Sequence, residues 1–189
     1  MKLNLLSTCL MVIAAIVAGS ACSGVSQYRY WNIYAMTEPA PSTEKLYDDG
    51  KIKVRFWIDE KKIHFRFSNL TSQMITINWR KAVYIHTDGK KHPVANIDSI
   101  FSDRKDDPPP SQIPPGKTVD DFLAPSQNVE KLEEWTWYAY PLFNLFNERA
   151  YDNKGKIFGV DMPVKAEGKW HTYKFRFKIS SVIPGVRRL

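Results

Sequence analysis

Four histidines are the side chains in this sequence best suited to hold a metal ion: His64, His86, His92 and His171. Asp88-Gly89 predicts a tight turn between the middle two. A two-residue turn there pairs His86 with Lys91 and places His86 and His92 on opposite faces, whereas a three-residue loop would pair His86 with His92. No third ligand stands nearby in the sequence, so we expect neither a metal nor a cofactor.

Cations recur at every second position in three stretches that alternate between polar and apolar residues. They are Lys53, Arg55, His64, Arg66, Lys174, Arg176 and Lys178. Side chains alternate between the two faces of a strand, so these residues share the outward faces of their strands and line one surface if the strands share a sheet. Such a basic face would attract anionic lipid or glycan, and an ordinary solvated face is the alternative.

The densest aromatic stretch is a second candidate binding surface. It contains Trp135, Trp137, Tyr138 and Tyr140, followed by Phe143 and Phe146. Aromatic side chains are favoured anchors for partners and sugars, because each offers a large rigid surface and some carry a polar group. The competing interpretation is that these rings pack the core and close one end of the fold.

Recognisable catalytic motifs are missing from the sequence. It contains no Gly-x-Ser-x-Gly turn, no His-Glu-x-x-His helix motif and no phosphate-binding glycine loop. We therefore expect a protein that is not an enzyme. The alternative is an enzyme acting on an envelope polymer, in a cleft between the proline-rich stretch 100–116 and the aromatic stretch. A catalytic triad whose members meet only in three dimensions would leave no sequence motif.

The start of the chain predicts export. Lys2 precedes an unbroken apolar run of nine residues, Leu10 to Ala18, and small residues follow up to Cys22. The run fits a secretory signal and is too short for a bilayer span, which takes ~20 apolar residues. The small residues before Cys22 resemble the bacterial lipobox, in which the cysteine is acylated and becomes the amino terminus. Gly19 replaces the usual leucine, so cleavage after Ala21 without a lipid is the alternative.

An acylated Cys22 implies a protein held at a membrane. By resemblance to lipoproteins of two-membrane bacteria, Ser23 directly after the cysteine is compatible with the outer membrane. The partners we expect are the membrane, through the lipid, and another envelope protein or an anionic lipid or glycan. Nucleic acid is not expected in that compartment. Cys9 lies in the discarded leader, so the mature chain has no second cysteine for a disulfide.

The rest of the chain predicts one all-β domain. The expected boundaries are a signal peptide at 1–21, a lipidated terminus and tether at 22–46, the domain at 47–183 and a tail at 184–189. Residues 129–134 are expected to make a helical turn, and 142–149 a short helix or a loop. About eight alternating strands predict an antiparallel β-sandwich with an immunoglobulin-like outline and one or two short helical turns, and a closed barrel is the alternative.

Several segments between residues 47 and 180 resemble a group of uncharacterised bacterial lipoproteins with a β-sandwich domain. They are Tyr47-Asp48-Asp49, the stretch 65–71, the stretch 75–79 with its tryptophan, Asp88-Gly89, the stretch 113–116 and Ala124-Pro125. The resemblance implies a sandwich fold and an envelope location, and it carries no activity. The leading hypothesis is a non-catalytic envelope lipoprotein that binds or scaffolds another envelope component.

Overall fold

Alternation between apolar and polar residues shapes the central strands. In β3 (Ile52–Ile58) and β4 (Ile63–Asn69) every second side chain is buried along most of the strand. The same alternation holds over residues 175–179 of β13 (Lys169–Pro184). Each of these strands therefore has one apolar face that another element must cover, and a two-layer sandwich is the arrangement that covers it.

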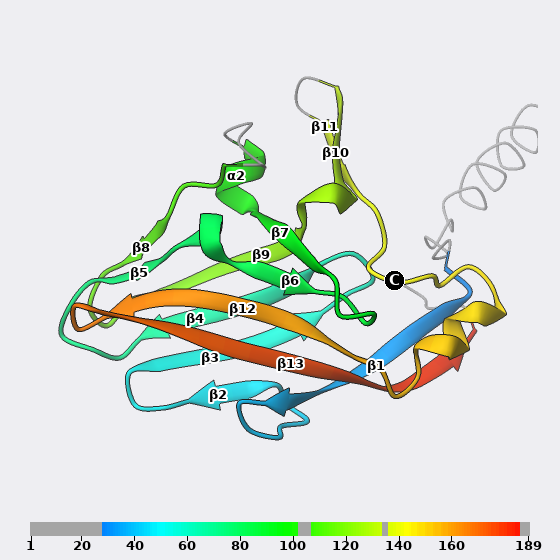
Figure 1. Ribbon diagram of the computed structural model, residues 1–189, viewed down its shortest axis with the longest axis horizontal. Helices are drawn as coiled ribbons and strands as arrows, with labels where there is room; N and C mark the ends of the chain where they lie inside the picture. The colour runs from blue at the N-terminus through cyan, green and yellow to red at the C-terminus, as the bar shows by residue number, and fades with distance from the viewer. Residues whose placement is uncertain (1–27, 102–106, 134–135, 186–189) are drawn as a thin grey trace, which may run out of the picture.

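The computed structural model describes residues 28–101, 107–133 and 136–185, and these confirm the mostly antiparallel β-sandwich, nearly closed like a barrel (Figure 1). They form 13 strands instead of about eight, and the immunoglobulin-like outline is not confirmed. The remaining strands are β1 (Tyr30–Glu38), β2 (Leu46–Asp48), β5 (Ile75–Ile77), β6 (Val83–Ile85), β7 (Lys91–Asn96), β8 (Ser111–Ile113), β9 (Thr118–Pro125), β10 (Val129–Glu133), β11 (Thr136–Ala139) and β12 (Ile157–Ala166). The short helices are η1 (Trp79–Lys81), α2 (Ile97–Phe101), η2 (Ser126–Asn128) and η3 (Glu148–Asn153).

One continuous path of paired strands makes both layers. Its order is β1-β13-β12-β6-β7-β9-β4-β3-β2, with β5 and β8 attached beside β12. Strand β7 pairs with β6 on one side and β9 on the other, and so joins the two layers. The hairpin of β10 and β11 is a separate two-stranded sheet that projects from the body (Figure 1).

The core is packed with aromatic rings from both layers. The ring of Phe56 in β3 lies 4.7 Å from that of Phe175 and 5.1 Å from that of Phe177, both in β13. Trp79, the tryptophan expected in the core, is 1% exposed and donates its indole N–H to Ser111 Oγ at 2.7 Å. Strands β3 and β13 therefore face each other across the core, in opposite layers.

The domain begins earlier than residue 47. Residues 30–38 lie within the expected tether, yet they form β1, which pairs along its length with the end of β13. The sequence hides this strand because its buried positions include a polar residue, Asn32, and its exposed positions include the apolar Ile33. At the other end, β13 runs to Pro184, one residue beyond the expected domain boundary.

The β6–β7 hairpin is confirmed, but its loop has three residues. His86 lies opposite Lys90, with its N–H bonded to the Lys90 carbonyl at 2.9 Å, and Gly89 adopts φ +81°. Tyr84 lies opposite His92. His86 and His92 therefore share a face of the hairpin and flank Tyr84, so the prediction of opposite faces is wrong, and so is a direct pairing of the two histidines.

Two other segments differ from the predicted structure: residues 129–134, expected to make a helical turn, and the stretch 100–116, whose prolines predict a long loop. Residues 129–133 form strand β10 instead of a helical turn, because they pair with β11. The stretch 100–116 includes the end of α2 and strand β8, which pairs with β5. Helix α2 starts after a reciprocal pair of bonds in which Asn96 N–H donates to Ser99 Oγ and Ser99 N–H donates to Asn96 Oδ1.

Candidate functional site

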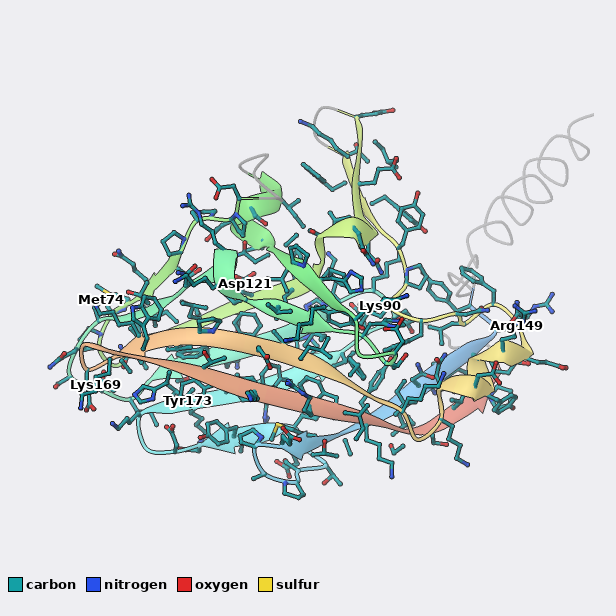
Figure 2. All side chains as sticks on the ribbon, viewed as in Figure 1. Met74, Lys90, Asp121, Arg149, Lys169 and Tyr173 are labelled. Atoms are coloured by element: carbon teal, nitrogen blue, oxygen red, sulfur yellow. The ribbon has the colours of Figure 1, made fainter. Side chains whose placement is uncertain are left out.

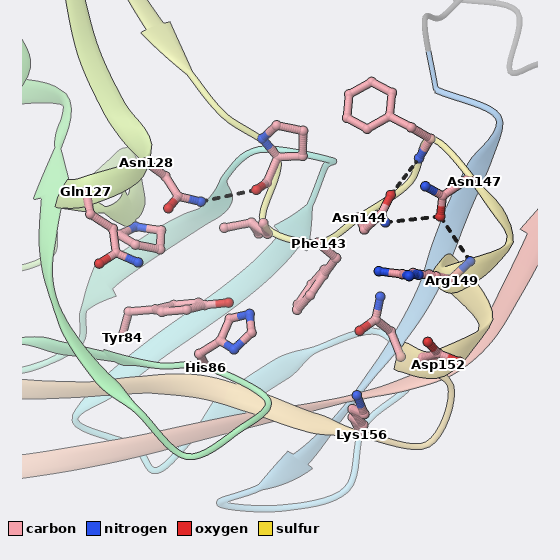
Figure 3. A pocket seen from close by; sticks show the side chains of 15 residues that line it. Tyr84, His86, Gln127, Asn128, Phe143, Asn144, Asn147, Arg149, Asp152 and Lys156 are labelled. Carbon is pink, nitrogen blue, oxygen red and sulfur yellow. Dashed lines mark hydrogen bonds between the residues drawn. The ribbon is translucent and has the colours of Figure 1, made fainter.

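A large pocket lies at one end of the sandwich. It has a volume of about 710 Å³ and is bounded by the β6–β7 hairpin and by the segment 125–156 (Figure 3). We call it the end pocket. Its lining residues are Tyr84, His86, Pro125, Gln127, Asn128, Pro141, Leu142, Phe143, Asn144, Phe146, Asn147, Arg149, Asp152, Asn153 and Lys156.

Tyr84 supplies a buried hydroxyl group to this pocket. The residue is 1% exposed, and its hydroxyl has no hydrogen-bond partner among the described residues. Figure 3 shows the hydroxyl end of the ring directed toward His86 and Phe143. Burial raises the pKa of the phenol, so it stays protonated and can both donate and accept a hydrogen bond.

His86 stands beside Tyr84 and is oriented by the hairpin loop. Its Nδ1 lies 3.2 Å from Asp88 Oδ1, and its ring centroid lies 6.0 Å from that of Phe143. The backbone N–H of Lys90, followed by the Lys90 ammonium and His86, lowers the pKa of Asp88 to about 2. Asp88 is therefore a carboxylate at neutral pH, and it holds the imidazole so that Nε2 is available to the pocket.

The opposite wall is held in place by side chains bonded to their own turn. Asn147 Oδ1 accepts the backbone N–H of Arg149 at 3.1 Å and caps η3. Asn144 Nδ2 donates to the same oxygen at 3.1 Å, while Asn144 Oδ1 accepts the N–H of Phe146 at 3.1 Å. These local bonds explain why an asparagine-rich segment adopts a fixed irregular structure here instead of a strand.

Three charged groups lie on this wall. Arg149, Asp152 and Lys156 form no ion pair with any other residue that the structure describes. Figure 3 shows the Arg149 guanidinium extending from η3 toward Phe143. Two cations and one carboxylate give this wall a small positive charge, which suits a polar ligand that carries an acid group.

The end pocket combines three kinds of surface that a sugar requires. Phe146 offers an exposed apolar ring, the carboxamides offer donors and acceptors, and the charged groups can bind hydroxyls or an acid group. Pockets of 300–1,000 Å³ with a few convergent polar groups are the usual form of small-molecule sites. The arrangement is suited to binding and orienting a saccharide-sized ligand.

The predicted basic face is divided between two surfaces. Lys53, Arg55 and Arg66 lie on the outer face of β3 and β4, whereas the cations of β13 lie on the outer face of the opposite layer. The physical reason is that β3 and β13 pack their apolar faces against each other, so that their outward faces point away from each other. The seven residues therefore do not form one surface.

Carboxylates neutralise the first of these two surfaces. Lys53 Nζ lies 3.7 Å from Asp48, and Arg55 Nη2 lies 3.3 Å from Glu44. Arg66 makes two bonds to Asp120, at 2.7 and 2.8 Å, which lower the pKa of that carboxyl. A pocket of about 300 Å³ lies between these three cations. The paired charges make it a solvated surface rather than a strong anion site.

On the second surface only one of the three predicted cations is paired. Arg176 is half-buried and bonds to Asp161 Oδ1 at 2.6 Å across β12 and β13. Lys174 and Lys178 are exposed and have no ion-pair partner among the residues that the structure describes. His64, on the outer face of β4, also has a carboxylate partner, because its Nε2 lies 2.7 Å from Asp59 Oδ2.

The aromatic stretch divides between two pockets. Trp135 lies outside the described residues. Trp137 and Tyr138 line a smaller pocket of about 310 Å³ between the β10–β11 hairpin and α2, together with Lys62, Ile97, Ile100, Phe122, Val129 and Ala139. Tyr140 is exposed and donates to Glu130 at 2.6 Å. Phe143 and Phe146 line the end pocket instead.

The smaller pocket is the counterpart of the cleft expected between the proline-rich and aromatic stretches. Ile100 comes from the first of those stretches, and Trp137 and Tyr138 come from the second. Among the described residues that line it, one is charged: Lys62, whose ammonium lies 4.0 Å from the Phe122 ring centroid. The described lining of this pocket therefore offers apolar and cation–π contacts.

Cys22 and the expected signal peptide lie outside the described residues. Within the described ranges, no group of three or more His, Cys, Asp or Glu side chains is placed to hold a metal ion. No helix in those ranges is both long enough and apolar enough to cross a bilayer.

Sequence reasoning missed most of the end pocket, including Tyr84, Arg149, Asp152 and Lys156. The signal available was the density of carboxamides between aromatic residues, with Asn144, Asn147 and Asn153 falling within ten positions. Side chains of this kind fold a turn and also present hydrogen-bonding groups. No family model, curated protein or solved structure matches the chain.

Proposed function

We propose that this chain is an exported lipoprotein, anchored through Cys22, whose end pocket binds an acid-bearing saccharide without transforming it. The observation that carries this proposal is the buried hydroxyl of Tyr84, which has no partner among the described residues and points into the pocket. Buried polar groups are rarely left unpaired, and those that are call for an explanation such as a ligand. A ligand hydroxyl would complete the hydrogen bonding of the phenol.

The charges of the pocket support a ligand with an acid group. Arg149 and Lys156 are cationic and uncommitted, and Asp152 can accept hydrogen bonds from sugar hydroxyls. An arginine guanidinium binds a carboxylate through two parallel N–H donors, so it favours a uronic acid over a neutral sugar. The leader-like start of the chain and Cys22 support an exported, membrane-anchored location.

Calorimetric titration of the purified protein tests the ligand class. Uronic-acid oligosaccharides should bind, and the matched neutral oligosaccharides should bind about ten-fold more weakly, since a charged hydrogen bond contributes ~1.5–3 kcal/mol. The double variant Arg149→Gln, Lys156→Gln should lose this preference. The matched control Lys53→Gln, Arg66→Gln removes two cations from a distant face and should keep it. Equal binding of acidic and neutral sugars, or no binding of either, would refute the proposal.

Intact mass tests the anchor separately. Protein recovered from membranes should carry an acylated terminus at Cys22, and a Cys22→Ser variant should lose both the acyl mass and the membrane retention. An unmodified terminus on a soluble protein would refute the anchor and leave the pocket proposal standing.

A second candidate function has one observation in its favour. His86 is oriented by Asp88 and faces the end pocket, as a general base would. An enzyme acting on an envelope polymer through this base would convert bound oligosaccharide to shorter products, and His86→Gln would abolish that turnover while retaining binding. Unchanged oligosaccharide after prolonged incubation supports the binding function instead.

A further inference from the structure

The amino-terminal segment joins the domain at the wall of the end pocket. Leu145 O accepts the backbone N–H groups of Arg29 and Tyr30, at 3.0 and 3.1 Å. The Tyr28 ring packs on Phe146, a lining residue of the pocket, with 5.2 Å between ring centroids. Any anchor on the preceding residues therefore attaches to the domain directly beside the pocket.

The chain between Cys22 and Tyr28 is too short for an anchor at Cys22 to hold the far end of the domain against the membrane. It spans six Cα–Cα steps, which reach about 20 Å at most when fully extended. Strand β13 has 16 residues and is therefore about 50 Å long. It ends beside Arg29, because the Gly185 N–H donates to the Arg29 carbonyl at 3.0 Å. Lys169, at its other end, lies far from Arg149 (Figure 2).

The surface around the pocket at this end is suited to a membrane interface. Phe146 and Tyr151 are 46% and 45% exposed. Arg29, Arg149, Lys154 and Lys156 are exposed cations in the same two segments, against the carboxylates Glu148 and Asp152. Aromatic and basic residues are favoured at an anionic membrane surface. The aromatic rings lie at the depth of the headgroups, and the cations contact phosphate or carboxylate groups.

We propose that the saccharide bound by the end pocket is the headgroup of a membrane lipid, and that the domain docks on the bilayer with this pocket facing the headgroups. The inference rests on the proposed function, since it identifies the molecule of which the acid-bearing saccharide is a part. The Cys22 anchor, the exposed aromatic rings and the uncommitted cations then act on the same surface. The anchor raises the local concentration of the pocket at the headgroups.

Vesicle flotation with the Cys22→Ser protein, which has no lipid anchor, measures the contribution of the pocket to membrane binding. Three vesicles share a phosphatidylcholine background and contain glucuronosyl diacylglycerol, glucosyl diacylglycerol or phosphatidylglycerol. We expect retention on the glucuronosyl vesicles, weaker retention on the other two, and release by free methyl glucuronide. Arg149→Gln, Lys156→Gln should weaken retention roughly thirty-fold, and the matched control Lys174→Gln, Lys178→Gln on the outer face of β13 should not.

The outcomes separate this inference from the proposed function. Binding of free methyl glucuronide without retention on glucuronosyl vesicles would overturn the lipid headgroup and leave the saccharide pocket intact. Retention on phosphatidylglycerol vesicles that equals retention on glucuronosyl vesicles, and that the pocket variant does not change, would also overturn the lipid headgroup. The protein would then be held by non-specific attraction to negative charge. Absence of binding to both the free sugar and the vesicles would overturn the proposed function itself. Unchanged thermal unfolding of each variant confirms that the fold is kept.

Discussion

Replacing Tyr84 with phenylalanine removes one oxygen atom from the floor of the end pocket and tests whether the pocket is built for a ligand. A buried polar group without a partner costs about 1–3 kcal/mol. The Tyr84 hydroxyl is such a group among the described residues, so Tyr84→Phe should raise the free energy of unfolding by at least about 1 kcal/mol. In a chain of this size, that corresponds to a rise in Tm of about 2–4 °C.

Tyr34→Phe is the matched control. Tyr34 is also buried, but its hydroxyl accepts a hydrogen bond from Asn32 Nδ2 at 3.3 Å. Removing that bonded hydroxyl should lower the free energy of unfolding by about 1 kcal/mol. Urea denaturation followed by intrinsic fluorescence measures both variants.

The same pair of variants separates stability from binding. Tyr84→Phe should weaken binding of the acidic saccharide about two- to ten-fold, the value of one hydrogen bond, while Tyr34→Phe should leave binding unchanged. If Tyr84→Phe destabilises the protein as much as Tyr34→Phe does, the Tyr84 hydroxyl is satisfied within the free protein. The phenol would then give no reason to expect a ligand in the end pocket.

Three further changes test the packing and electrostatics of the fold. Phe177→Ala removes a fully buried ring from the core and should cost about 3–5 kcal/mol in urea denaturation. Gly159→Ala places a Cβ against the Phe175 carbonyl oxygen, so thermal unfolding should show a loss of about 1–3 kcal/mol, and an unchanged Tm would contradict the packing described. Burial opposes ionisation of Asp59, but bonds from His64 and two backbone N–H groups outweigh it and lower the pKa of this carboxyl. Its contribution is therefore present above the unfolded pKa of ~3.9 and lost as pH falls through the lower folded value, so Asp59→Asn should lose less stability than the unmodified protein between about pH 5 and pH 3.

The sequence predicted the strands whose polar and apolar residues alternate. β3, β4 and the middle of β13 have an apolar residue at every second position, and the alternation was enough to place them. β1 escaped detection because Asn32 is buried and Ile33 is exposed, which breaks the pattern. Local patterns report which side of a strand is buried, and they say little where the sheet edge or a neighbouring turn decides burial instead.

The candidate sites were harder to predict because they depend on which strands face each other. The outward parity of the cations was correct, but parity alone does not tell whether β3 and β13 lie in one layer or in opposite layers. The end pocket combines Tyr84 with Arg149 and Lys156, which are more than 60 positions away in the chain. Only the path of strands in three dimensions brings such residues together.

Mapping the binding of methyl glucuronide by amide chemical shifts tests the central claim most directly. Addition of the sugar should move the signals of the β6–β7 hairpin loop around His86 and of the segment around Arg149, Asn153 and Lys156. Signals on the outer face of β3 and β4 should stay in place. Shifts centred instead on Trp137 and α2, or spread over the outer face of β13, would contradict the assignment of the end pocket as the binding site.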